Sequence, residues 1–137
     1  MPLIEDFDSR FTLGVPAIDR SHREMVELIN QMDGASDATF VYLFADLVNH
    51  TRAHFASEEV MMRESLYPAF AEHKDEHARV LAELSRFPGR LGGVRTALAR
   101  AYVREQMPAW FALHATTFDS ALVAHLNQVR SRVPAPT

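Results

Sequence analysis

The 137-residue sequence contains no cysteine, and this absence excludes several classes of site. Disulfide bonds, cysteine-ligated zinc, ordinary iron–sulfur clusters and thiol catalysis all need the missing side chain. Any metal that this chain binds must therefore have nitrogen and oxygen ligands.

The sequence also lacks basic runs and long apolar runs. The net charge is −4 and the basic residues are scattered, so nothing matches a nucleic-acid phosphate backbone. No window approaches about 18 uncharged apolar residues, and the acidic N-terminal stretch does not resemble a secretion signal. We expect a cytoplasmic protein that contacts neither nucleic acid nor membranes, and a monomer rather than an oligomer.

The overall composition is that of an ordinary globular chain. Hydrophobic residues make up 47% and charged residues 23%, and a chain of this length fits one core. Strand-like alternation and internal repeats are both missing. We therefore predict one domain over 1–137, with an arm over 1–18, a helical bundle over 19–130 and a frayed tail over 131–137.

Apolar residues at three- and four-residue steps predict four helices. Asp19 is the expected N-cap of the first, which runs to about residue 32 and stops at Gly34. The second begins after Ser36 or Asp37 and runs to about residue 65. The third runs from Pro68 or Ala69 to about residue 86, where the segment 87–89 ends it.

The fourth helix is expected from residues 92–94 to about 129, with Leu98 on its inward stripe. Pro108 should kink or break it near Gln106, because proline cannot continue the helical hydrogen bonds. Short links between four helices favour antiparallel neighbours, so the fold class is all-α, an up-down-up-down antiparallel four-helix bundle. Gly14 and Pro16 forbid a long helix before it, which predicts an N-terminal extended arm on the outside of the bundle.

Seven histidines are present, and the apolar stripe of each helix is interrupted by at least one of them. His54 and Glu58 lie four residues apart, as do His73 and His77, so each pair projects from one helix face and can share a metal. His114 and Asp119 lie five apart, which in a regular helix separates them by roughly 140°. A bridging role at another edge of the site therefore suits Asp119. His22 stands alone in the first helix.

Counting ligand atoms sharpens this interpretation. Five histidines give five nitrogens, and two bridging carboxylates give four oxygens. Two six-coordinate metals that share one solvent-derived oxygen would then keep one position open. Nitrogen-rich ligands without thiolates suit iron better than structural zinc, calcium or magnesium.

These residues resemble the hemerythrin family in its bacterial single-domain form, over nearly the whole chain. Four segments carry the resemblance: Ile18-Asp19-Arg20-Ser21-His22, His54-Phe55-Ala56-Ser57-Glu58-Glu59, Tyr67-Pro68 followed by His73-x-x-x-His77, and Trp110 ahead of His114-x-x-x-x-Asp119. The family implies a four-helix bundle with a non-haem di-iron centre, two iron ions (Fe²⁺/Fe³⁺) and a bridging oxo or hydroxo group.

The resemblance also implies a role for each of these residues. His73, His77 and His114 would hold one iron, His22 and His54 the other, and Glu58 and Asp119 would bridge the two. Dioxygen would bind reversibly at the two-histidine iron, for oxygen carriage, storage or sensing. The sequence leaves open a protein partner that receives oxygen or a signal.

Several neighbouring residues have a simpler interpretation. His50 is assigned to the surroundings of the site or to solvent, and His125 lies about 16 Å from His114 along a helix, too far to reach the same metals. Glu59 is interpreted as a solvated charge on the helix surface. Trp110, Phe55 and Phe111 are core aromatics that would also shield the metals from water.

Two other functions remain as alternatives. The first is a di-iron oxidase or oxygenase on the same bundle, which typically carries paired Glu-x-x-His motifs and more carboxylates. No glutamate stands three residues before any histidine here, so we expect a binding protein and not an enzyme. The second is an iron-handling regulatory protein, which would need a separate output protein.

Overall fold

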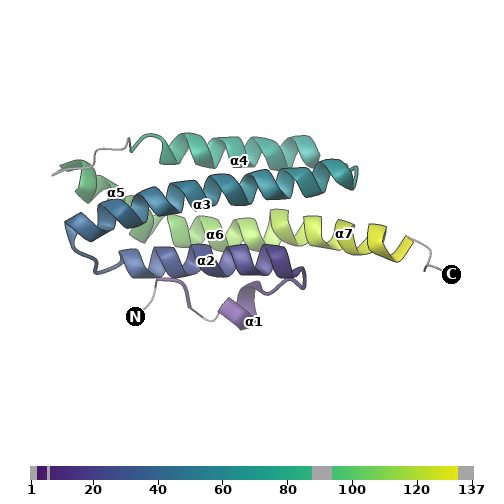
Figure 1. Cartoon of the computed structure of the whole chain (residues 1–137), viewed down its shortest axis with the longest axis horizontal. Helices are drawn as coiled ribbons and strands as arrows, with labels where there is room; N and C mark the ends of the chain where they lie inside the picture. Colours follow the sequence, from purple (N-terminus) through teal and green to yellow (C-terminus); the bar gives the residue numbers. More distant parts are fainter. Residues whose placement is uncertain (1–2, 6, 88–93, 133–137) are drawn as a thin grey trace.

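The computed structural model describes residues 3–5, 7–87 and 94–132, and these residues form helices without any strand. None of these helices is long and apolar enough to cross a membrane. Figure 1 shows their order along the chain. The elements are α1 (Phe7–Phe11), α2 (Pro16–Met32), α3 (Asp37–Glu64), α4 (Phe70–Leu84), α5 (Val94–Glu105), α6 (Met107–His114), the π-helix η1 (Ala115–Asp119) and α7 (Ser120–Arg132).

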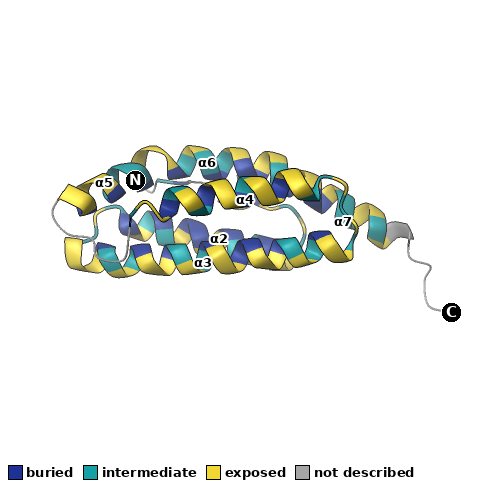
Figure 2. Ribbon diagram, turned by 90° about the horizontal axis from the view of Figure 1, so that it is seen from above, coloured by how far each residue is buried: buried dark blue, intermediate teal, exposed yellow. Residues whose placement is uncertain are grey.

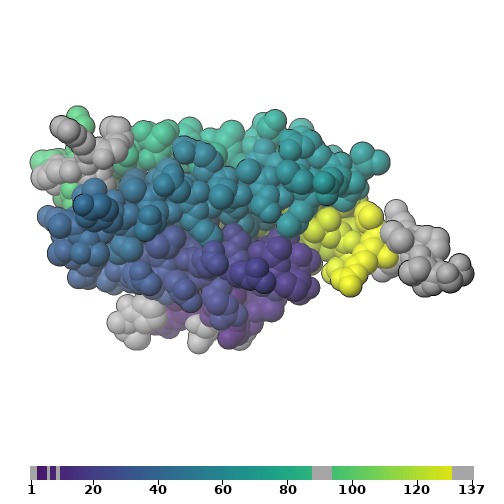
Figure 3. Space-filling model, viewed as in Figure 1, coloured from purple at the N-terminus to yellow at the C-terminus, as the bar shows by residue number. Residues whose placement is uncertain are grey.

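Four rods lie side by side, in agreement with the predicted all-α four-helix bundle (Figure 1). Three rods are the single helices α2, α3 and α4, and the fourth is the succession α5, α6, η1 and α7. Helix α3 packs against both α2 and α4, and α2 also contacts α5. One end of α7 extends beyond the other rods (Figures 1 and 3). The molecule is therefore elongated along the helix axes.

Each rod buries one side and exposes the other, and the buried sides face one another (Figure 2). One apolar cluster fills the interior around Phe40, Phe55 and Phe111, and a smaller one surrounds Ile18 and Leu122. Burial of each such side chain contributes roughly 1.5–3 kcal/mol to the free energy of folding. The helices are therefore stabilised mainly by packing of their apolar faces and less by intrinsic helix propensity.

Helix α2 begins at Pro16, three residues before the predicted N-cap. Proline fits a first helical turn because its missing N–H would have no partner there, so the helix needs no cap at Asp19. The carboxylate of Asp19 instead accepts hydrogen bonds from the backbone N–H groups of Leu13 and Gly14, at 2.8 Å and 3.0 Å. The prediction of Asp19 as N-cap was wrong, because this side chain orders the preceding turn.

The link between α2 and α3 agrees with the prediction. Helix α2 ends at Met32, and Gly34 follows with a positive φ of 86°. Ser36 is the N-cap of α3, and its hydroxyl accepts a hydrogen bond from the backbone N–H of Thr39 at 3.2 Å. Gly34 and Ser36 could both be recognised from the sequence because each acts on its immediate neighbours in the chain.

The fourth rod breaks at Gln106, as predicted from Pro108, which lies in the first turn of α6. Leu98 was placed wrongly on the inward stripe, since its side chain is 57% exposed while Thr96, Ala99 and Val103 are buried. The third helix was predicted from residue 68 or 69 to about residue 86, and α4 spans Phe70–Leu84. The predicted stop residues 88–89, the start of the fourth helix at 92–93 and the tail at 133–137 lie outside the described residues.

The N-terminal segment packs against the bundle through Ile4 and Phe11, which are both buried. The backbone N–H of Ile4 donates to the side-chain oxygen of Asn30 at 2.8 Å. Residues 7–11 form the short helix α1, so the segment is not extended throughout.

The turn between α3 and α4 holds a leucine in a left-handed conformation. Leu66 has a φ of 54°, and its side chain is 84% exposed. Its N–H donates to the carbonyl of Arg63 at 3.3 Å, and the N–H of Tyr67 donates to that of Met62 at 2.9 Å. This is the Schellman pattern of helix ends, in which glycine is the usual residue at the left-handed position. Leu66 therefore adopts a conformation that its Cβ disfavours.

Glycine should be more stabilising than alanine as a replacement for Leu66. We expect Leu66→Gly to have a free energy of unfolding about 1 kcal/mol higher than Leu66→Ala, because both lose the same exposed side chain and only glycine removes the strain. Urea unfolding of the two variants measures this difference. An alanine variant as stable as the glycine variant would contradict the account of this turn.

Candidate metal centre

The seven residues predicted as metal ligands converge inside the bundle, and all seven are buried. Each of the four rods contributes to the group, so the site exists only when the rods are packed together. The residues are His22 on α2, His54 and Glu58 on α3, His73 and His77 on α4, His114 at the end of α6 and Asp119 at the end of η1.

The π-helix η1 brings Asp119 next to His114. A π turn contains one more residue than an α turn, so residues five apart return to the same side of the helix. Oδ1 of Asp119 consequently lies 3.2 Å from Nε2 of His114. The expected separation of roughly 140° between His114 and Asp119 assumed a regular α-helix and was wrong. Asp119 still reaches the other edge of the site, because its Oδ2 lies beside His22.

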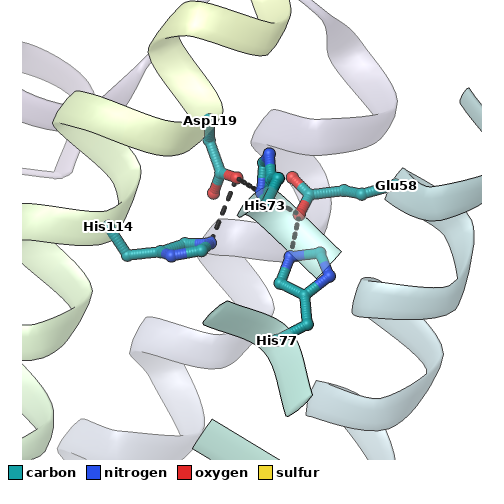
Figure 4. A group of neighbouring side chains, drawn as sticks. All are labelled: Glu58, His73, His77, His114 and Asp119. Atoms are coloured by element: carbon teal, nitrogen blue, oxygen red, sulfur yellow. Dashed lines mark hydrogen bonds and ion pairs between the residues drawn. The ribbon is translucent and has the colours of Figure 1, made fainter. Parts of the chain in front are cut away.

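Glu58 lies between two sets of imidazoles. Its Oε1 is 3.1 Å from Nε2 of His77 and 3.6 Å from Nε2 of His73 (Figure 4). Its Oε2 faces the other way, 3.6 Å from Nε2 of His54. The two oxygens of this one carboxylate therefore serve different histidines.

Asp119 repeats this arrangement from the opposite side. Its Oδ1 lies 3.1 Å from Nε2 of His73 and 3.2 Å from Nε2 of His114 (Figure 4). Its Oδ2 lies 2.7 Å from Nε2 of His22. All five histidines thus direct Nε2 toward a carboxylate oxygen.

The ligand atoms form two groups, and within each group the atoms lie within 4.8 Å of one another. The larger group has three histidines and the smaller has two. Glu58 and Asp119 belong to both groups, which is the geometry of two neighbouring cations that share bridging carboxylates. The groups are Glu58, His73, His77, His114 and Asp119, and His22, His54, Glu58 and Asp119.

Unpartnered polar atoms show that these residues fit a pair of cations. Among the described residues, every buried side-chain nitrogen or oxygen without a hydrogen-bond partner belongs to this cluster, including Nε2 of His54, His73 and His114 and Oε2 of Glu58. Leaving such groups unpaired costs about 1–3 kcal/mol each. Cations between the carboxylates and the imidazoles would remove much of this cost.

The pKa values in the cluster reflect burial and mutual charge. Burial and the neighbouring His22 lower the pKa of His54 to about 3, and burial and His73 lower that of His77 to about 2. Burial would also lower the pKa of His73, but the carboxylates of Asp119 and Glu58 raise it to about 9.

The pKa values of the two carboxylates are shifted in opposite directions. Burial and Asp119 raise the pKa of Glu58 well above its usual value. Burial opposes ionisation of Asp119 as well, but His114, His22 and His73 hold its pKa well below the usual value. Metal ligation needs ionised carboxylates and neutral imidazoles, so cations here would compete with protons for Glu58 and His73.

Aromatic rings surround the imidazoles. Phe55 stacks on His77 with 3.8 Å between ring centroids, and Trp110 stacks on His114 at 4.9 Å. Phe111 meets His22 edge-on at 5.4 Å. Phe55 and Phe111 are buried and Trp110 is half-buried, so these rings separate the cluster from solvent.

The two remaining histidines lie outside both groups. Nε2 of His50 donates to the backbone carbonyl of Ser21 at 2.8 Å, and the ring is half-buried. Nε2 of His125 donates to the backbone carbonyl of Ser65 at 2.9 Å. Both imidazoles therefore have structural partners of their own.

Glu59 has a position that the sequence interpretation missed. Its Oε2 accepts a hydrogen bond from Nδ1 of His77 at 3.1 Å, and its side chain is 19% exposed. The prediction of a solvated surface charge was therefore wrong. The position of Glu59 directly after Glu58 could have indicated this contact. Consecutive helix residues are about 100° apart, so their side chains can approach one ring of the adjacent helix from two sides.

Known proteins are similar to this chain in both sequence and fold. Residues 13–132 match the family described as the hemerythrin HHE cation binding domain. A bacteriohemerythrin of Ralstonia nicotianae is 34% identical over 128 residues, covering 93% of this chain and 92% of the relative. A myohemerythrin of Sipunculus nudus is 27% identical over 113 residues, covering 82% and 86%.

A solved structure agrees with these relatives at the level of the fold. The crystal structure of a point mutant of hemerythrin superposes with a TM-score of 0.60 at 20% identity, covering 85% of this chain and 97% of that one. Together with the family match over most of the sequence, this likeness leads to one conclusion: the chain belongs to the hemerythrin family.

Proposed function

We propose that this protein binds dioxygen reversibly at a non-haem di-iron centre, for oxygen carriage, storage or sensing. The observation that carries the proposal is the sharing of Glu58 and Asp119 between a three-histidine group and a two-histidine group. A single metal would not need two carboxylates that each divide their oxygens between opposite sets of imidazoles.

The two groups assign the ligands. His73, His77 and His114 would hold one iron, and His22 and His54 would hold the other. Glu58 and Asp119 would bridge the pair, together with an oxo or hydroxo group derived from solvent. The family and the nitrogen-rich, thiolate-free donor set both favour iron.

A reduced iron pair held by these residues would supply an open coordination position for dioxygen. The chain itself supplies selectivity for a small apolar ligand, because Phe55, Phe111 and Trp110 line the imidazoles and exclude water. The smaller number of histidines in the His22 and His54 group favours that side for the open position.

We further propose that residues 1–137 act as one domain with the up-down-up-down antiparallel topology. The helix contacts of α3 with both α2 and α4 support this arrangement. Antiparallel packing would direct side chains from all four rods toward the same level of the bundle, as the metal pair requires.

Reversibility separates oxygen binding from catalysis. Purified protein that is loaded with ferrous iron and exposed to air should gain visible absorption, and repeated degassing should remove it. The visible spectrum through several cycles measures this. Absorption that appears once and cannot be reversed, or steady consumption of oxygen with an added reductant, would contradict reversible binding.

Replacing a proposed ligand should remove iron, whereas replacing a histidine outside the site should not. We expect His77→Ala to lose iron and to unfold at a lower temperature, because it removes one ligand and leaves the other buried groups less well compensated. His125→Ala should keep about two iron ions per chain, as expected for two six-coordinate metals. Equal iron content in the two purified variants would contradict the assignment.

A further inference from the structure

The imidazole of His77 is held at both of its nitrogens. Nε2 lies 3.1 Å from Oε1 of Glu58, and Nδ1 lies 3.1 Å from Oε2 of Glu59. The two glutamates are consecutive residues of α3, while His77 is on α4. The contact with Glu58 belongs to the metal centre, but the contact with Glu59 faces away from it.

Three other histidines of the cluster differ at this outer nitrogen. Nδ1 of His22, of His73 and of His114 is buried and has no hydrogen-bond partner among the described residues. These three rings therefore have polar contacts at Nε2 but no side-chain acceptor at Nδ1. His77 is the contrasting case, because a carboxylate accepts its outer N–H.

A third residue of α3 sets the plane of the His77 ring. Phe55 stacks on it with ring centroids 3.8 Å apart and an interplanar angle of 6°. Phe55 and Glu59 are four residues apart, so they project from the same side of α3. About one turn of this helix thus holds the ring by its face, by its inner nitrogen and by its outer nitrogen.

We propose that Glu59 is a positioning residue that fixes His77 in the tautomer and orientation needed for metal binding. When Nδ1 carries the proton and donates it to Glu59, Nε2 keeps its lone pair, which points toward Glu58 and the centre. A carboxylate acceptor also makes the imidazole a stronger donor to a metal. The inference rests on the proposed function, since it concerns the same site.

The structure offers a matched set of variants. Glu59→Ala removes the acceptor, and Glu59→Gln keeps an oxygen at the same place. Glu64→Ala is the control, because Glu64 is an exposed glutamate of the same helix, so the change in residue and in charge is the same. Thermal unfolding of the metal-free proteins should give similar melting temperatures for all three.

The first measurement is the tautomer of His77 in the metal-free protein, from the imidazole ¹⁵N shifts in NMR spectra. Signals that disappear in His77→Gln identify the ring. We expect protonation at Nδ1 in the wild type, in Glu59→Gln and in Glu64→Ala, and a mixture of the two tautomers in Glu59→Ala. An unchanged tautomer in Glu59→Ala would overturn the proposal.

The second measurement is competition for ferrous iron with a chromophoric chelator under argon. Glu59→Ala should bind iron about 10- to 100-fold more weakly than the wild type, the usual effect of losing a partner of a metal-bound histidine. Glu59→Gln should recover most of the affinity, and Glu64→Ala should match the wild type.

The iron measurements distinguish failure of the proposed role of Glu59 from failure of the proposed function. If the wild type and Glu59→Ala hold two irons with equal affinity, Glu59 has no positioning role while the di-iron centre stands. If the wild type itself holds no iron, the proposed function fails and this inference fails with it.

Discussion

The structure depends on how the buried imidazoles and carboxylates at the centre of the bundle are compensated. Five imidazoles and two carboxylates occupy positions where the rods would otherwise pack apolar side chains. Each unpartnered group costs about 1–3 kcal/mol, and a domain has only about 5–15 kcal/mol of stability in total. Several buried polar atoms of the cluster have no hydrogen-bond partner among the described residues. A pair of metal ions would therefore contribute to folding as well as to ligand binding.

This requirement explains one local departure from regular helix, the π-helix η1. The π-helix η1 adds a residue to the fourth rod and so places Asp119 and His114 on the same side, where both approach His73. The break at Gln106 lies eight residues before His114, outside the cluster. The aromatic rings then cover the imidazoles, and their stacking contacts hold the ring planes. The π-helix and the aromatic packing therefore both help to fix the arrangement of the ligand atoms.

The sequence predicted the parts of this arrangement that follow from a regular period. His54 with Glu58, and His73 with His77, share a helix face because four residues make about one turn. The proximity of Asp119 to His114 was not predictable, because a spacing of five residues does not distinguish a π turn from an α turn. The hydrogen bond of Glu59 depends on how α3 and α4 pack, and Asp19 serves the turn before α2 because Pro16 already starts that helix. The missing information was therefore of two kinds: local backbone geometry at η1 and at the start of α2, and the packing of α3 against α4.

The central claim is that Glu58 and Asp119 each join two metal ions. Anomalous diffraction at the iron edge, from crystals of the iron-loaded protein, tests it most directly. The account predicts two peaks per chain, one beside His73, His77 and His114 and one beside His22 and His54, with both carboxylates in contact with both peaks. A single peak, or a peak next to His50 or His125, would contradict it.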